Sequence, residues 1–93
     1  MAASIGRDMI GQRERIREVF STILQCTPGE IHDAASPETL ERWDSFQHLV
    51  LVAGFEEEFG IEIEPEEIDR MFKNFRVFRE VIEGKLAEKY QEA

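Results

Sequence analysis

Apolar residues recur at the spacing of one helix face in three separate stretches of the chain. Within residues 8–25, arginines and glutamates separate the members of a series at i, i+3, i+4, i+7 and i+8: Ile16, Val19, Phe20, Ile23 and Leu24. The last stretch carries a similar series: Phe75, Phe78, Val81, Ile82 and Leu86. Between them, residues 45–59 are apolar over most of their length. Such periodicity is typical of helices that bury one side, so the pattern predicts three long helices.

Residues that favour the beginning or the end of a helix lie at the boundaries of the predicted helices. Gly60 suits the position just after a helix, because glycine readily adopts the left-handed conformation. Pro65 suits the first position of a short helix over 65–71, and Asn74 can cap the last long helix. Three long helices, one short helix and a long first loop predict an all-α fold, a small up-and-down four-helix bundle.

The first loop, residues 27–44, is long for so small a chain. Pro28 and Gly29 break regular structure, and the segment Ser36-Pro37-Glu38-Thr39 is typical of a short helical turn. A loop of this length is usually functional or held against the protein. We expect three side chains to hold it there: Ile31, Leu40 and Trp43.

The helix expected over residues 45–59 is apolar on two sides. The side expected to face the core contains Leu51, Val52, Phe55 and Phe59. The other side contains Phe46, Val50 and Ala53. Because a small bundle has little room to bury a whole helix, we expect this other side to form an exposed apolar strip that a partner covers.

The chain has 93 residues, so we expect one domain over 1–93, with its core in about 8–86 and frayed ends. Cys26 is the only cysteine, which excludes an intramolecular disulfide framework and a cysteine-based zinc cluster. The sequence has no signal-peptide h-region and no apolar run of about 20 residues. We therefore expect a cytoplasmic monomer that does not bind membranes.

The net charge of −9 is concentrated in the middle of the chain. Residues 27–69 contain thirteen acidic residues against the single Arg42. Such a surface repels nucleic acid and anionic lipid and attracts a basic protein, so we expect no nucleic-acid binding. Glu41 and Glu56 are candidate contacts for the basic partner.

Other polar clusters indicate no chemistry of their own. The glutamates at 56–58 point in different directions around a helix and cannot hold one ion together, so we expect no metal site. No basic constellation surrounds Cys26, which favours an inert thiol. Four basic residues at i+3 spacing are expected to form one stripe, partly balanced by Glu66 and Asp69: Arg70, Lys73, Arg76 and Arg79.

Ser45 is the candidate for covalent chemistry. Asp44 is a preferred N-cap residue, so Ser45 falls in the first turn of the second helix with its hydroxyl outside the core. The positive end of the helix dipole stabilises a phosphate attached there. A hydrolase is disfavoured, because His48 at i+3 has no visible orienting group and the strand–turn–helix setting of a nucleophilic serine is absent. We expect no catalytic residue, and we expect His48 to face solvent or a partner.

The stretch from Leu40 to Phe59 (LERWDSFQHLVLVAGFEEEF) resembles the prosthetic-group site of acyl carrier proteins. There, Asp-Ser-Leu precedes a helix that ends in a Leu-Glu-Glu-Glu-Phe-like segment. The resemblance implies that Ser45 carries a phosphopantetheine arm, transferred from coenzyme A by a phosphopantetheinyl transferase that uses magnesium. It also implies that Asp44 takes part in recognition by the transferase. The thiol of the arm would carry acyl groups as thioesters, and the protein itself would not be an enzyme.

Further expected partners follow from the same resemblance. An acyl or aminoacyl ligase would load the arm, and acyltransferase or synthase enzymes would use the cargo. These enzymes would dock on the apolar strip and on the acidic residues near it. The docking residues we expect are Phe46, Val50, Ala53, Glu41 and Glu56.

Three departures from the family pattern affect which carrier this is. Phe46 stands where leucine is usual, and Trp43 stands where a small residue is common. Gln47, His48 and Val50 occupy positions that are often acidic or small and polar in carriers of fatty-acid synthesis. We therefore favour a stand-alone, specialised acyl carrier of a lipid or secondary-metabolite pathway. Two alternatives stay open: an aminoacyl or peptidyl carrier, although its usual Gly-Gly-x-Ser pattern is missing, and an unmodified structural interaction module of the same fold.

Overall fold

The structure of the protein is a computed structural model that describes residues 5–92, with side chains described for residues 11–90. Its elements in chain order are α1 (Ile5–Leu24), the 3₁₀ helix η2 (Pro28–Glu30), α2 (Ser45–Phe59), α3 (Pro65–Met71) and α4 (Phe75–Glu92). Residues 5–92 contain no strand, so the predicted all-α fold of three long helices and one short helix is confirmed. No helix in this range is both long and apolar enough to cross a membrane.

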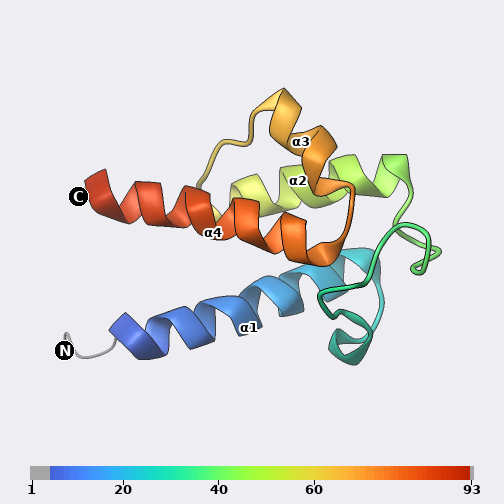
Figure 1. The fold of residues 1–93 in the computed structure, drawn as a ribbon, viewed down its shortest axis with the longest axis horizontal. Coiled ribbons are helices and arrows are strands. Elements are labelled where there is room, and N and C mark those ends of the chain that lie inside the picture. The colour runs from blue at the N-terminus through green and yellow to red at the C-terminus, as the bar shows by residue number, and fades with distance from the viewer. Residues whose placement is uncertain (1–4, 93) are drawn as a thin grey trace.

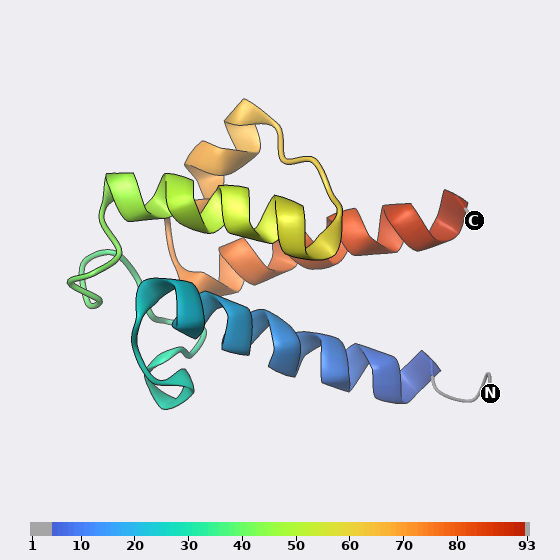
Figure 2. The same ribbon diagram turned by 180° about the vertical axis from the view of Figure 1, so that it is seen from behind.

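The three long helices lie lengthwise along the molecule, and the short α3 lies on the opposite side of α2 and α4 from α1 (Figures 1 and 2). α2 and α4 both begin at the end of the bundle where α1 finishes. The long loop leads directly from α1 to the start of α2, and α3 with its loops brings the chain back to that end before α4 begins. The long loop between α1 and α2 gathers at the same end. The first turn of α2, which contains Ser45, therefore lies at this end of the bundle, next to the long loop.

Aromatic rings fill the centre of the core. Phe20 of α1 meets the rings of Trp43, Phe75 and Phe78 edge to face, with each pair of ring centroids 5.0 Å apart. Aromatic pairs in this arrangement stabilise the fold beyond the area that they bury. The buried apolar residues include most of the predicted helix faces: Ile16, Phe20, Leu24, Leu51, Val52, Phe55, Phe75, Phe78, Val81, Ile82 and Leu86. Val19, Ile23 and Phe59 pack against this core and are only partly buried.

The long loop is held as the sequence predicts, with one further contact. Ile31 and Trp43 are buried and Leu40 is partly buried against the core. The predicted turn at 36–39 forms, and the Leu40 N–H donates to the Ser36 carbonyl at 2.8 Å. Ala35, which was not predicted from the sequence, is buried, and its carbonyl accepts from the Phe75 N–H at 2.7 Å. The loop therefore supplies a backbone acceptor at the start of α4, where helix N–H groups lack partners of their own.

The helix ends confirm the rules applied to the sequence. Gly60 follows α2 with φ of 64°, a left-handed conformation that favours glycine. Pro65 is the first residue of α3, and the Asn74 side chain accepts from the Val77 N–H at 2.9 Å at the start of α4.

Gly54, within α2, allows close packing against α1, because a Cβ placed there would lie 2.6 Å from Cδ1 of Ile23. The missing side chain at Gly54 lets α1 approach α2 closely.

The expectation of one basic stripe is wrong. Arg70 lies in α3 and Lys73 lies between helices, while Arg76 and Arg79 belong to α4. A change of helix direction after Met71 separates them into two groups. Arg79 is largely buried and pairs with Asp33 of the loop and with Glu83 one turn along α4, not with Glu66 or Asp69. This arginine therefore helps to hold the long loop against α4.

Candidate functional site

Asp44 caps α2 as predicted. Its backbone is extended, with φ of −102° and ψ of −177°, and Oδ1 accepts from the Gln47 N–H at 2.8 Å. The Asp44 carbonyl accepts from the His48 N–H at 2.8 Å, which is the first hydrogen bond of the helix. The cap fixes the place where the extended loop turns into α2. Replacing such a cap by alanine typically costs about 1 kcal/mol.

Ser45 is the first residue of α2 and is exposed. The N–H groups of the first helical residues have no carbonyl partner within the helix, and they lie at the positive end of its dipole. Asp44 satisfies the N–H of Gln47, and the other N–H groups of this first turn belong to the exposed residues Ser45 and Phe46. A phosphodiester on the Ser45 hydroxyl would find these donors beside it, so the residues present fit a phosphate-linked group.

The outer face of α2 beside Ser45 is apolar and exposed, as the sequence predicts. Phe46 is 69% exposed, Val50 is 38% exposed, and Ala53 is also exposed. Leu49, which is 57% exposed, was not predicted from the sequence. Its i+3 distance from Phe46 was the available signal. The apolar strip of α2 is therefore Phe46, Leu49, Val50 and Ala53, and nothing in residues 5–92 covers it.

The two acidic residues expected at the docking face differ in their surroundings. Glu41 is exposed in the turn before Trp43. Glu56 is half-buried, and its Oε2 accepts from the Ile63 N–H at 2.9 Å. Glu56 therefore holds the segment between α2 and α3, and only part of its carboxylate is open to a partner. The fold gives this glutamate a structural use that was not predicted from the sequence.

The expectation that His48 faces solvent or a partner is wrong. His48 is 4% exposed and lies between the loop, α3 and α4. The Trp43 Nε1–H donates to His48 Nδ1 at 3.0 Å, and His48 Nε2–H donates to the Ile68 carbonyl at 2.7 Å. The imidazole is therefore part of the core and joins Trp43 of the loop to Ile68 of α3, which lies 20 residues away from it in the sequence.

Burial lowers the pKa of His48, because the protonated ring loses its hydration. The hydrogen bond to the Ile68 carbonyl and the Asp69 carboxylate both act in the opposite direction. Trp43 and Phe72 lie against the ring, with centroids 5.9 Å and 4.7 Å away. Both ring nitrogens of His48 are engaged away from Ser45, so His48 cannot serve as a base that activates the Ser45 hydroxyl.

Cys26 lies near the end of α1 and is partly buried. Burial raises the pKa of its thiol, and the nearby Glu30 raises it further, while Arg42 acts to lower it. A raised pKa leaves less thiolate at neutral pH, and the thiolate is the reactive form. These surroundings favour the inert thiol expected from the sequence.

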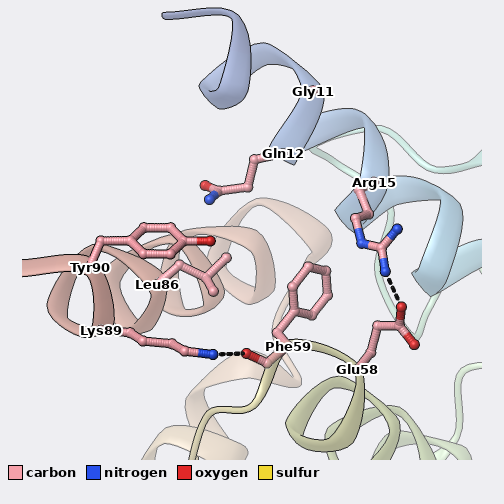
Figure 3. A pocket seen from close by; sticks show the side chains of 8 residues that line it. All are labelled: Gly11, Gln12, Arg15, Glu58, Phe59, Leu86, Lys89 and Tyr90. Atoms are coloured by element: carbon pink, nitrogen blue, oxygen red, sulfur yellow. Dashed lines mark hydrogen bonds and ion pairs between the residues drawn. The ribbon is translucent and has the colours of Figure 1, made fainter. Parts of the chain in front are cut away.

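A surface pocket lies at the other end of the bundle, between the early part of α1, the end of α2 and the late part of α4 (Figure 3). Arg15 pairs with Glu58 and also lies over the Phe59 ring, with Cζ 5.6 Å from the centroid. Lys89 Nζ donates to the Phe59 carbonyl at 2.8 Å. Both cations that line this pocket are engaged within the protein, Arg15 by the Glu58 carboxylate and Lys89 by a neutral backbone carbonyl.

Comparison with known proteins identifies the fold. No family model and no curated protein matches the sequence. Among solved structures, the protein is similar to the holo acyl carrier protein from Geobacter metallireducens, determined by solution NMR. The TM-score is 0.75 at 20% sequence identity, and the match covers 85% of this chain and 90% of that chain. At this identity the likeness shows the fold alone, and the fold of this protein is that of an acyl carrier protein.

Proposed function

We propose that this protein is a carrier that holds acyl groups on a phosphopantetheine arm attached to Ser45. The supporting observation is the exposed serine at the first position of α2, directly after an aspartate cap and beside an exposed apolar strip. The fold shared with a holo acyl carrier protein supports the same proposal. When bound, the arm would supply a terminal thiol that carries cargo as a thioester.

The residues of this chain would position the arm rather than catalyse a reaction. Attachment would form a bond from Ser45 Oγ to the phosphate of the arm, and the nucleotide part of coenzyme A would leave. The free N–H groups at the start of α2 would stabilise the new phosphodiester charge. Asp44 would keep the first turn of α2 in place while the phosphopantetheinyl transferase binds.

The apolar strip would dock each partner enzyme in turn. Phe46, Leu49, Val50 and Ala53 present apolar side chains on one face of a rigid helix, which is a common way to bind a partner. Glu41 and other exposed acids of the middle segment would attract a basic partner surface. The proposed partners are a transferase, a ligase that loads the arm, and acyltransferase or synthase enzymes of lipid or secondary-metabolite synthesis.

Intact-mass measurement tests the proposal directly. The wild type is incubated with coenzyme A, Mg²⁺ and a promiscuous phosphopantetheinyl transferase, beside a control carrier. We expect a mass increase of one phosphopantetheinyl group, mapped to Ser45 by peptide fragmentation. Ser45→Ala should show no increase, and the matched variant Thr22→Ala, which removes an exposed hydroxyl on α1, should be modified like the wild type.

The outcomes separate the remaining candidate functions. An unmodified wild type under conditions that modify the control carrier would refute the carrier function and leave a structural interaction module. If the arm attaches, loading with acyl and aminoacyl donors by candidate ligases distinguishes an acyl carrier from an aminoacyl carrier, because the arm is the same in both.

A further inference from the structure

The hydrogen bonds around His48 admit only one of the three protonation states of its imidazole. The indole nitrogen of Trp43 can only donate, so His48 Nδ1 has to accept with a lone pair. The Ile68 carbonyl can only accept, so His48 Nε2 has to carry the proton. The neutral Nε2–H form satisfies both partners. A protonated ring would instead point an N–H group at the N–H group of Trp43.

Both partners use this imidazole to satisfy a polar group, which is the indole N–H of Trp43 and the backbone carbonyl of Ile68. Trp43 is 1% exposed, and a buried indole N–H without an acceptor destabilises the fold. Ile68 lies in the last turn of the seven-residue helix α3, where carbonyl groups have no helical donor. His48 supplies that donor. The ion pair between Lys85 and Glu67, at 2.8 Å, is a second link that holds α3, in this case to α4.

The same residue also begins the helix that presents Ser45. The backbone N–H of His48 donates to the Asp44 carbonyl, and Trp43 is the residue directly before Asp44. One residue therefore contacts the loop just before the cap, forms the first helical hydrogen bond after it, and ties α3 to α2. A change in the His48 ring reaches the Asp44–Ser45 junction through these bonds.

We propose that His48 is a positioning residue for the Ser45 site, which in its neutral Nε2–H form fixes Trp43 and α3 against the first turn of α2 and releases both when protonated. The use made of the site rests on the proposed function, whereas the coupling from His48 to Ser45 is a property of the unmodified protein. The two can therefore fail separately.

Few charged groups lie around the His48 ring, so a transition on acidification can be assigned to His48 itself. From α4 and the segment after α3, the ring meets Phe78 and Phe72, and from the loop it meets Trp43, none of which titrates in acid. From α3, the Asp69 carboxylate acts on the ring and raises its pKa. Burial outweighs it, and the pKa of His48 lies below its usual value. α2 contributes no charged side chain between Ser45 and Phe55.

NMR and fluorescence on the unmodified protein test the coupling. At neutral pH we expect a scalar coupling between Trp43 Nε1 and His48 Nδ1 across the hydrogen bond. On acidification this coupling should vanish and Trp43 fluorescence should fall, because a protonated imidazole quenches indole. The midpoint should lie below about 6.5, the value of free histidine. The Ser45 and Phe46 amide signals should shift with the same midpoint.

Two variants and one control isolate the ring. His48→Gln does not titrate, so its fluorescence and Ser45 amide signals should lack the transition. Trp43→Phe keeps an aromatic ring but removes the donor, so the pKa of His48 should rise toward its usual value, and this variant serves if His48→Gln fails to fold. His32→Gln removes the other histidine, which is exposed in the loop, and should leave the transition unchanged.

The rate of modification tests the positioning role. The ratio of kcat/KM between wild type and His48→Gln, measured with one transferase across pH, cancels the titration of the transferase. At neutral pH and higher, we expect kcat/KM of the wild type to be about twofold to thirtyfold that of His48→Gln. The ratio should fall toward one as His48 protonates. A ratio that is constant across pH, or Ser45 amide signals that ignore the titration of His48, would overturn the proposal. A wild type that is never modified but shows the coupled amide shifts would instead refute only the proposed function.

Discussion

The two sides of α2 differ sharply although the sequence makes both of them apolar. The inner side, with His48, Leu51, Val52 and Phe55, is buried against α1, α3, α4 and the loop. The outer side, the apolar strip Phe46, Leu49, Val50 and Ala53, is exposed. The apolar character of a whole helix therefore does not tell which residues stabilise the fold and which remain for a partner. That assignment comes from the neighbouring elements.

The largest expected difference between the two sides is in stability. Phe55→Ala should lower the free energy of unfolding by about 3–5 kcal/mol, because it leaves a cavity at a fully buried position. Phe46→Ala on the outer side removes a ring of the same size and should change the free energy of unfolding by less than about 0.5 kcal/mol. Urea unfolding followed by circular dichroism measures both. Equal losses would show that the outer ring is also packed.

His48→Gln should reveal a buried polar contribution on the inner side. At pH 7.5, we expect a loss of about 1–3 kcal/mol, because the flexible side chain of glutamine does not hold an acceptor and a donor at the positions of Nδ1 and Nε2. The lowered pKa of His48 means that the unfolded chain binds the proton more readily than the folded protein. The contribution of His48 is therefore fully present above about pH 6.5 and is lost as the pH falls through that value toward the folded pKa. Denaturant unfolding at pH 7.5 and 5 should show the two proteins converging; a constant difference would contradict this.

Asp44→Ala should have a smaller effect at the junction of the two sides. The loss of the bond to the Gln47 N–H should cost about 1 kcal/mol of stability. If Asp44 also takes part in recognition by the transferase, modification of Ser45 should slow by more than the folded fraction explains. Asp44→Asn, which keeps a capping oxygen without the charge, separates the two roles. Normal modification of both variants would limit Asp44 to capping.

Substitutions on the outer side should have the smallest effect on stability while impairing transfer. Val50→Glu and Leu49→Glu place a charge on the proposed docking surface and should leave the unfolding midpoint nearly unchanged. Transfer of cargo to a partner enzyme should show a raised KM, because the charge has to be desolvated on docking. Glu80→Gln, at an exposed position of α4 outside the acidic middle segment, is the control. Unchanged transfer kinetics in both strip variants would contradict docking there.

Local chemistry is enough to place the ends of the helices. The cap at Asp44, the left-handed Gly60, Pro65 at the start of α3 and the cap at Asn74 each depend on a few neighbouring residues. Helical periodicity likewise predicted the apolar core residues of α1, α2 and α4, but not the burial of His48. These features were readable because their causes act within one or two turns of the chain.

The sequence by itself determined the four helices, their caps and the exposed serine at the first position of α2. Only the tertiary structure decided the surroundings of His48, Glu56 and Arg79, because the Ile68 carbonyl, the Ile63 N–H and Asp33 come from other segments. Local spacing placed His48 near Ser45 and suggested exposure, whereas the packing of the loop, α3 and α4 buried it. Groups from different segments of the chain come together only when the bundle closes. For this reason only the tertiary structure decided which hydrogen-bond and ion-pair partners these side chains have.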